Sequence, residues 1–169
     1  MTGGGGVTAI VRKLEKRDRQ AASRDVPDIG LGMLLRDGNA VFNKALRDEL
    51  ARHGISFSQY QHLRQLWHQD GLVQVELSRR IGIETASSTA VIDQLETFGL
   101  IRRKRDATDR RRIIVTLTPA GRALEKPLDG CAIAVNSRAR SGLSKEEVAS
   151  LFDLIGKIIG NLGGKTRRQ

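Results

Sequence analysis

The chain has 169 residues, of which 39% are hydrophobic and 4% aromatic, and 29 basic against 19 acidic side chains give a net charge of +10. This composition supports one helical core, disfavours an aromatic-rich β-sandwich, and favours a polyanionic partner such as a nucleic acid. With no apolar run of about 18 residues, no apolar leader and a single cysteine, the sequence excludes a membrane-spanning protein and a disulfide-stabilised secreted domain, so we expect a cytoplasmic protein that does not bind membranes.

The N-terminal part is predicted to be a flexible basic arm, residues 1–27, because it is rich in glycine and charge and poor in apolar anchors. A helical spacing of apolar residues then predicts a first helix from Ile29 to Leu50. Its apolar stripe comprises Leu31, Leu34, Leu35, Val41, Phe42, Ala45, Leu46 and Leu50. A second helix is expected to begin at a cap formed by Ser56 or Ser58 and to end near Gln69.

Two shorter helices follow, separated by a glycine that favours a turn. The third should span Gln74–Ile81, with Val75, Leu77 and Ile81 facing the core, and the fourth should span Thr85–Phe98. The fourth helix is polar at its beginning, where small hydroxyl side chains predominate, and apolar in its second half.

The most strongly charged stretch is Arg102–Arg112, in which seven of eleven residues are basic and two are Asp. Its arrangement predicts a β-hairpin with strands at Ile101–Arg105 and Arg111–Leu117 and a turn at Asp106–Asp109. A rigid, cationic hairpin suits the groove of a nucleic acid duplex, although a solvated surface loop is the alternative.

The C-terminal part is predicted to contain two more helices. Thr118 and Pro119 should begin a fifth helix that reaches Arg140, with a kink or break at Pro127. A capping box opened by Ser144 predicts a sixth helix to about Leu162, followed by a basic tail over 163–169. Because the first and sixth helices carry more apolar surface than one small lobe can cover, we expect the first, fifth and sixth helices to pack against a second copy of the chain.

Residues 75–117 therefore predict a helix-turn-helix extended by a β-hairpin wing. The segment Leu77–Gly121 resembles the winged-helix core of the MarR family of bacterial transcription regulators. The matching pieces are Leu77-Ser78 with Ile81, the IDQLE-x-x-GLI-x-R run from Ile92 to Arg103, Asp109-Arg110-Arg111, and Leu117-Thr118-Pro119-Ala120-Gly121.

The resemblance implies a mainly α fold with a small β-hairpin wing and six helices, dimerising through the N- and C-terminal helices. It places a MarR-type domain at 28–162, with the winged lobe at about 56–118 and dimerisation helices at about 28–53 and 119–162. In such a homodimer the fourth helix enters the major groove of a pseudo-palindromic operator and the wing reaches the flanking minor groove. The implied DNA-binding residues are Thr85, Ser87, Ser88, Thr89, Arg105, Asp109, Arg110 and Arg111.

Two details qualify these site residues. Asp109 is expected to orient Arg110 or Arg111 through a charge-assisted hydrogen bond. Ala90 and Gln94 stand where family members often carry arginine, which shifts phosphate binding toward the wing. The hydroxyls that begin the fourth helix could instead be ordinary capping groups facing water.

The family also implies a small aromatic or anionic effector, such as a phenolic acid or its thioester, bound in a crevice lined by the first, second and fifth helices. The candidate lining residues are Arg36, Asn39, Phe42, Asn43, Tyr60, Arg64 and Trp67. Phe42 and Trp67 could equally be plain core residues.

The resulting hypothesis is a sequence-specific repressor of transcription that binds double-stranded DNA and is neither an enzyme nor a cofactor protein. A redox- or metal-sensing regulator on the same scaffold and a non-specific architectural nucleic-acid-binding protein remain as alternatives. Cys131 is expected to be buried and inert rather than an oxidation sensor. His53, His62 and His68 lack the spacing of metal ligands, so solvated or packed histidines are expected.

Overall fold

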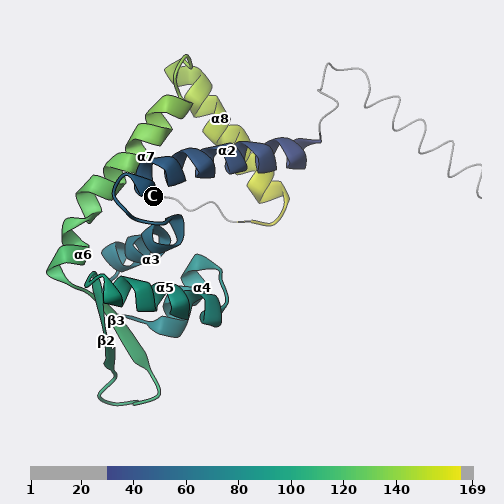
Figure 1. The fold of residues 1–169 in the computed structure, drawn as a ribbon. Helices are drawn as coiled ribbons and strands as arrows, with labels where there is room; N and C mark the ends of the chain where they lie inside the picture. Colours follow the sequence, from purple (N-terminus) through teal and green to yellow (C-terminus); the bar gives the residue numbers. More distant parts are fainter. Residues whose placement is uncertain (1–29, 165–169) are drawn as a thin grey trace, which may run out of the picture. The chain divides into compact units, whose positions relative to one another are not determined.

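The structure is a computed structural model and describes residues 30–164. The predicted arm over 1–27 and most of the basic tail lie outside the described residues. The elements are α2 (Leu31–Ala51), α3 (Phe57–His68), β1 (Leu72–Val73), α4 (Gln74–Ile81), α5 (Thr85–Thr97), β2 (Ile101–Arg105), β3 (Ile113–Leu117), α6 (Pro119–Ala123), α7 (Glu125–Ala139) and α8 (Lys145–Asn161) (Figure 1). Of the described residues, 30–40 belong to one compact unit and 41–164 to another. The mainly helical fold with a hairpin wing is thus confirmed.

Local capping explains where three helices begin. At α3, the Ser56 hydroxyl accepts a hydrogen bond from the Gln59 backbone N–H (3.2 Å), and the Gln59 side chain accepts one from the Ser56 N–H (2.9 Å). Ser144 and Glu147 form the same capping box at α8, and Thr118 caps α6 before Pro119. Each cap satisfies backbone donors that the first helical turn leaves unpaired.

The predicted fifth helix is divided in two, and the break is not at Pro127. The helix is interrupted at Leu124, between α6 and α7, although the backbone dihedrals of Leu124 stay in the right-handed helical region (φ −78°, ψ −11°). Pro127 lies in the first turn of α7, where a missing backbone N–H costs nothing because no intrahelical acceptor exists for it. The prediction of an interruption was correct, and its predicted position was wrong.

The wing belongs to a three-stranded antiparallel sheet of order β1-β3-β2. In the predicted hairpin, Ile101 pairs with Leu117 and Arg105 with Ile113. The two-residue strand β1 was not predicted; Leu72 pairs with Val115 and ties the start of α4 to the base of the wing. The wing is therefore anchored to the helices at its base and projects away from them at its tip (Figure 1).

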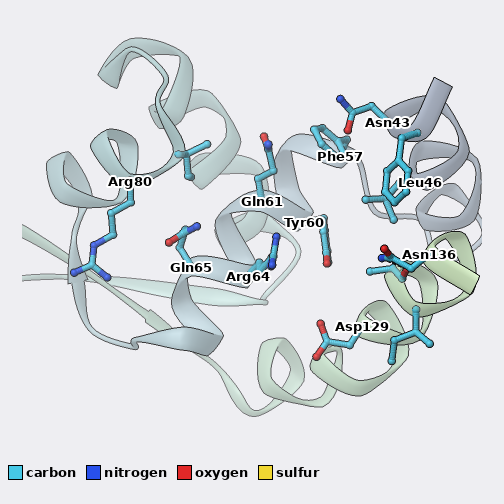
Figure 2. Close-up of a pocket in the computed structure, with 14 residues that line it drawn as sticks. Asn43, Leu46, Phe57, Tyr60, Gln61, Arg64, Gln65, Arg80, Asp129 and Asn136 are labelled. Carbon is cyan, nitrogen blue, oxygen red and sulfur yellow. Dashed lines mark hydrogen bonds between the residues drawn. The ribbon is translucent and has the colours of Figure 1, made fainter. Parts of the chain in front are cut away.

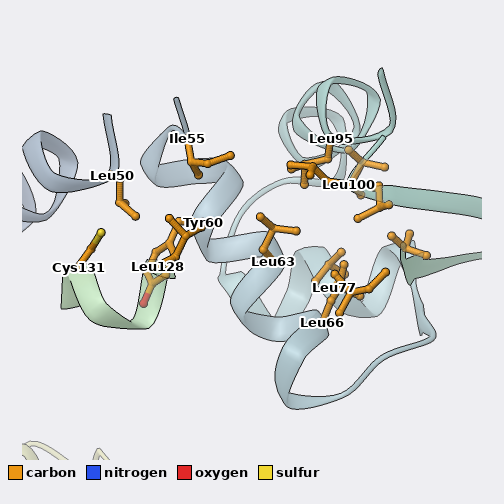
Figure 3. Packing of buried hydrophobic residues seen from close by; sticks show 14 of the residues in the cluster. Leu50, Ile55, Tyr60, Leu63, Leu66, Leu77, Leu95, Leu100, Leu128 and Cys131 are labelled. Atoms are coloured by element: carbon orange, nitrogen blue, oxygen red, sulfur yellow. The ribbon is translucent and has the colours of Figure 1, made fainter. Parts of the chain in front are cut away.

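The core of the second unit joins the helices to this sheet. Leu50, Tyr60, Leu128 and Cys131 lie at one end of the buried cluster, and Leu66, Leu77, Leu95 and Leu100 lie at the other (Figure 3). Val75, which was expected to face the core, is 62% exposed, because Leu77 and Ser78 of the same short helix occupy the inward face.

Gly121 allows a close approach between α6 and the base of the wing. A Cβ atom at this position would lie 2.0 Å from the backbone oxygen of Leu100 and 3.2 Å from the Leu117 side chain. No side chain fits there without displacing backbone. The glycine of the Leu-Thr-Pro-Ala-Gly segment is therefore a packing requirement.

Helix α8 has an apolar surface that its own unit leaves uncovered. None of its residues, all of which the structure describes, is buried, and Leu151, Phe152 and Leu154 are largely exposed. The guanidinium of Arg140 lies 5.7 Å from the centre of the Phe152 ring, which covers one aromatic face. Over residues 30–164, no helix has both the length and the hydropathy needed to span a bilayer.

Candidate nucleic-acid interface

Helix α5 presents one face to solvent and packs the other against α3 and α4. Thr85 and Ser87 are exposed and Thr89 is half-buried, whereas Ile92 and Leu95 are fully buried. Ser88 was expected on the groove-facing side, but its exposure is 0%. The spacing from Ser88 to Ile92 and Leu95 is i, i+4 and i+7, so the hydroxyl lies on the apolar stripe and not on the outer face.

Ser88 is bound there by a buried histidine of α3. The Nδ1 of His62 lies 2.7 Å from the backbone oxygen of Ser58, so Nδ1 carries the proton, and Nε2 accepts a hydrogen bond from the Ser88 hydroxyl at 2.9 Å. Burial lowers the pKa of His62, which keeps the ring neutral and preserves this arrangement. The expectation of a packed histidine is confirmed for His62, and the pair fixes α5 against α3.

The wing carries its cations on both faces of the hairpin. Arg102 and Lys104 alternate with Arg103 along β2, and Arg105 occupies the last pair of the ladder, opposite Ile113. Arg110, Arg111 and Arg112 are exposed beyond it. Besides Arg103, the wing has six basic residues, and within residues 30–164 none of these six forms an ion pair with a carboxylate. These six charges are therefore available to an external polyanion.

Arg103 has a different role, which the sequence did not reveal. Its guanidinium contacts the Glu96 carboxylate at 2.6 Å and the Asp93 carboxylate at 2.6 Å, and its backbone N–H donates to Glu96 at 2.9 Å. Hydrogen bonding from Arg103 lowers the pKa of Glu96, so the pair stays ionised. Both acids lie on α5, so Arg103 joins the wing to that helix. The only signal was that all three residues fall within the IDQLE-x-x-GLI-x-R run.

The wing tip is shaped by its two aspartates rather than by arginine contacts. Asp106 accepts hydrogen bonds from the Thr108 hydroxyl (2.6 Å) and backbone N–H (2.8 Å), which lower its pKa. Asp109 accepts one from the backbone N–H of Arg111 (3.0 Å). Among the described residues, no guanidinium bonds to Asp109, so the expected side-chain contact is wrong and Asp109 positions the backbone of the turn.

A cavity of about 540 Å³ lies beside α3, away from the wing. It is lined by α2, α3 and α7, as predicted, and also by α4. Four of the predicted residues meet there: Phe42, Asn43, Tyr60 and Arg64. Figure 2 shows Tyr60, Arg64 and Asp129 directed toward the same hollow. Burial raises the pKa of Tyr60, which keeps its hydroxyl protonated as a hydrogen-bond donor.

The other effector candidates have different places. Trp67 does not line this cavity; its indole N–H donates to the backbone oxygen of Gly121 at 2.9 Å, and its ring packs at an angle against Tyr60. The alternative that Trp67 is a structural residue is therefore confirmed. Arg36 and Asn39 are not among the residues that line the cavity, whose lining starts at Phe42, so their role in effector binding remains a prediction. Asp129, missed by sequence reasoning, lies one turn before Ile133 on α7.

The sites proposed for a sensor chemistry are poorly suited to it. Cys131 is buried, as expected, and burial raises the pKa of its thiol, which disfavours the reactive thiolate. His53 follows α2 and His68 ends α3, and both side chains are exposed. In the part of the chain that the structure describes, no group of three His, Cys, Asp or Glu residues is arranged to hold a metal ion.

Comparison with known proteins agrees with this geometry. The model of the MarR family matches residues 55–113, which span α3 to the start of β3. The HTH-type transcriptional regulator TtmR of Methylorubrum extorquens is 32% identical over 112 residues, which cover 66% of this chain and 56% of TtmR. The chain thus spans little more than half the length of that relative.

Two solved structures extend the similarity to about three quarters of the chain. A probable transcriptional regulator from Pseudomonas aeruginosa is 30% identical with a TM-score of 0.68, over 78% of this chain and 98% of the other. BpsR from Bordetella bronchiseptica is 26% identical with a TM-score of 0.67, over 76% and 97%. The structure of BpsR concerns the regulation of its DNA binding by 6-hydroxynicotinic acid.

Proposed function

Since this chain belongs to the MarR family of winged helix-turn-helix transcriptional regulators, a family of DNA-binding proteins and not of enzymes, we propose that it is a homodimeric repressor. It binds a pseudo-palindromic operator in double-stranded DNA and therefore acts in the cytoplasm. The observation that supports the proposal is the wing: within residues 30–164, six of its basic residues form no ion pair, and Arg103 joins the hairpin to Asp93 and Glu96 of α5.

The two parts of this interface divide the work of binding. Cations of the wing neutralise phosphates, which supplies affinity that does not depend on sequence. The exposed beginning of α5 carries Thr85, Ser87 and Thr89, whose short polar side chains can approach base edges in the major groove. Arg105, Arg110 and Arg111 are the residues we assign to the flanking minor groove and its phosphates. Asp109 supports them through the turn, and Ser88 supports α5 from inside.

The proposed dimer rests on the exposed apolar face of α8. Leu151, Phe152 and Leu154 would each gain about 1.5–3 kcal/mol if fully buried, so a face of this kind favours association with a second copy. Two winged lobes related by a two-fold axis would contact half-sites about one helical turn apart.

Footprinting with the full chain on fragments selected from genomic DNA tests the proposal. We expect protection of two half-sites related by a two-fold axis, with selected fragments bound at least about a thousandfold more tightly than random duplex. Equal affinity for selected and random duplex would instead establish the architectural alternative. A chain that protects no DNA at any salt concentration would overturn both.

We further propose that the cavity beside α3 binds an aromatic acid that releases the operator. Arg64 has no ion-pair partner among the described residues and can bind a carboxylate, while Tyr60 and Phe42 offer ring surface. Asp129 can accept a hydrogen bond from a ring hydroxyl, which favours a phenolic acid or its thioester. The aromatic acid that regulates BpsR supports this ligand class.

The same helix that lines the cavity also holds α5, which gives a route for release. The Ser88 hydroxyl bonds to His62, and the side chains of Gln59 and Gln94 are joined at 3.2 Å, so a ligand that moves α3 also moves α5. An effector acts only by binding the released state more tightly. Calorimetric titration with hydroxylated aromatic acids and their thioesters tests the site: we expect heat from at least one, lost in Arg64→Met and kept in Arg47→Met. No heat from any compound would refute it.

A further inference from the structure

Helix α5 has an unusual composition for a helix that reads bases: Thr85–Thr97 contains no lysine and no arginine. Guanine presents two acceptors in the major groove, N7 and O6, and is most often recognised by a bidentate cation. The outer face of α5 offers instead the methyl groups of Ala86 and Ala90, which are exposed, and the half-buried side chain of Thr89. These three residues are neighbours at i, i+3 and i+4 spacing.

The hydroxyl of Thr89 is already committed in a specific way. It donates its only proton to the backbone oxygen of Thr85 at 2.8 Å. It also accepts a hydrogen bond, at 2.8 Å, from the side-chain amide of Gln74, the first residue of α4. A hydroxyl has one proton and two lone pairs, so Thr89 has a single lone pair left for a ligand and no proton.

Gln74 holds this state in place. Its side chain is nearly buried, with 8% exposure, and its amide oxygen has no hydrogen-bond partner among the described residues. In the opposite amide orientation, the Gln74 amide oxygen would face the Thr89 hydroxyl oxygen, and the two could bond only if Thr89 stopped donating to Thr85. That orientation would also leave the buried NH₂ group of Gln74 without an acceptor. The observed orientation makes two hydrogen bonds where the reverse makes one, so it is favoured.

From this network we infer that Gln74 is a specificity-determining residue: it restricts Thr89 to accepting a hydrogen bond, so that α5 selects an exocyclic base amine and rejects guanine. Adenine N6 and cytosine N4 both present such an amine. Ala86 and Ala90 select between them, because the thymine opposite adenine carries a methyl group for apolar contact and the guanine opposite cytosine does not. The base pair read at this point is A·T. The inference rests on the proposed function, since it concerns how the operator is read.

An adenine scan of the operator tests the inference directly. Each adenine of the selected half-site is replaced in turn by the unsubstituted purine nucleotide, which lacks only the 6-amino group, and the same replacement outside the half-sites serves as the control. With the full chain, we expect one position at which the replacement weakens binding about tenfold. Replacement of the same A·T pair by G·C or C·G should weaken binding at least as much.

Two variants then assign that position. Thr89→Val keeps the shape of the side chain without its hydroxyl, so the loss caused by the purine nucleotide should fall from about tenfold to about twofold at that position only. Gln74→Ala frees the Thr89 hydroxyl to rotate and donate to guanine. We therefore expect its preference for A·T over G·C there to fall to about twofold, with affinity for the original operator kept within about threefold. Gln69→Ala, which removes an exposed amide at the end of α3, should change neither quantity.

The outcomes separate the inference from the proposed function. If the wild-type chain binds selected and scrambled duplexes equally, the proposed function fails. If it binds a specific operator but tolerates every purine replacement, or prefers C·G or G·C at the position that Thr89→Val affects, the inference is overturned and the proposed function stands. A uniform loss of affinity in Gln74→Ala on all duplexes, with the base preference intact, would show a merely structural role and would also overturn it. Thr89→Val decides the matter if Gln74→Ala does not fold.

Discussion

Removing the two tip arginines together, in Arg110→Ala/Arg111→Ala, should reduce the salt dependence of operator binding by a calculable amount. Both side chains are exposed, and neither forms an ion pair within residues 30–164, so their charges are free to neutralise phosphates. Each cation that contacts a phosphate contributes about 0.9 to the slope of log K against log salt concentration. In a homodimer the double variant should therefore lower the slope by about 1.8 if one tip arginine per subunit contacts a phosphate, and by about 3.6 if both do.

The measurement is the operator affinity by fluorescence anisotropy at several salt concentrations with a labelled duplex. Arg47→Ala is the control, because it removes one exposed arginine charge per chain from α2, away from the wing, and should leave the slope unchanged. The affinity of the double variant for random duplex should fall in parallel, since phosphates are common to every sequence. A double variant with the wild-type slope would refute the assignment of the wing tip to the phosphate backbone, whatever its affinity at one salt concentration.

Three further predictions concern the scaffold. Glu96→Gln should lower the free energy of unfolding by about 1 kcal/mol at neutral pH. Because Arg103 lowers the pKa of Glu96, this stabilisation is present above the ordinary glutamate pKa and is lost as the pH falls through the pKa of the folded state. Urea titrations of the two proteins should therefore give the same stability in acid, and a difference that stays constant with pH would contradict the prediction. Leu154→Glu should be monomeric by light scattering, whereas Ser150→Glu, at an exposed position of the same helix, should remain dimeric. If both variants remain dimeric, the interface lies elsewhere. Gly121→Ala should lower the free energy of unfolding by more than about 3 kcal/mol, whereas Gly130→Ala, at a position with open space around it, should leave it unchanged or raise it. Thermal melts measure the difference, and equal melting temperatures for the two variants would disprove the packing argument.

The features that could be predicted from the sequence are those set by neighbours along the chain. The predicted capping box at Ser144 and the cap at Ser56, one of two candidates, both depend on a residue three positions later, and the helical periods depend on spacings of three and four. The hairpin followed from the alternation in Ile113–Leu117 and from the Asp-rich turn between two basic arms. These interactions span few residues, so local sequence is sufficient to specify them.

The direction in which individual side chains point was decided by tertiary contacts. Ser88 faces inward because His62 of α3 lies opposite it, and Val75 faces outward because Leu77 and Ser78 occupy the inward face of that short helix. Arg103 was one of seven basic residues in the charged stretch with no role assigned to it, and only the fold brought it to Glu96 and Asp93. The partners in these pairs are 7 to 26 positions apart, and the contact between Gln74 and Thr89 spans 15. Local spacing fixes which elements form, but a partner's identity depends on how those elements pack, and only the folded chain supplies that.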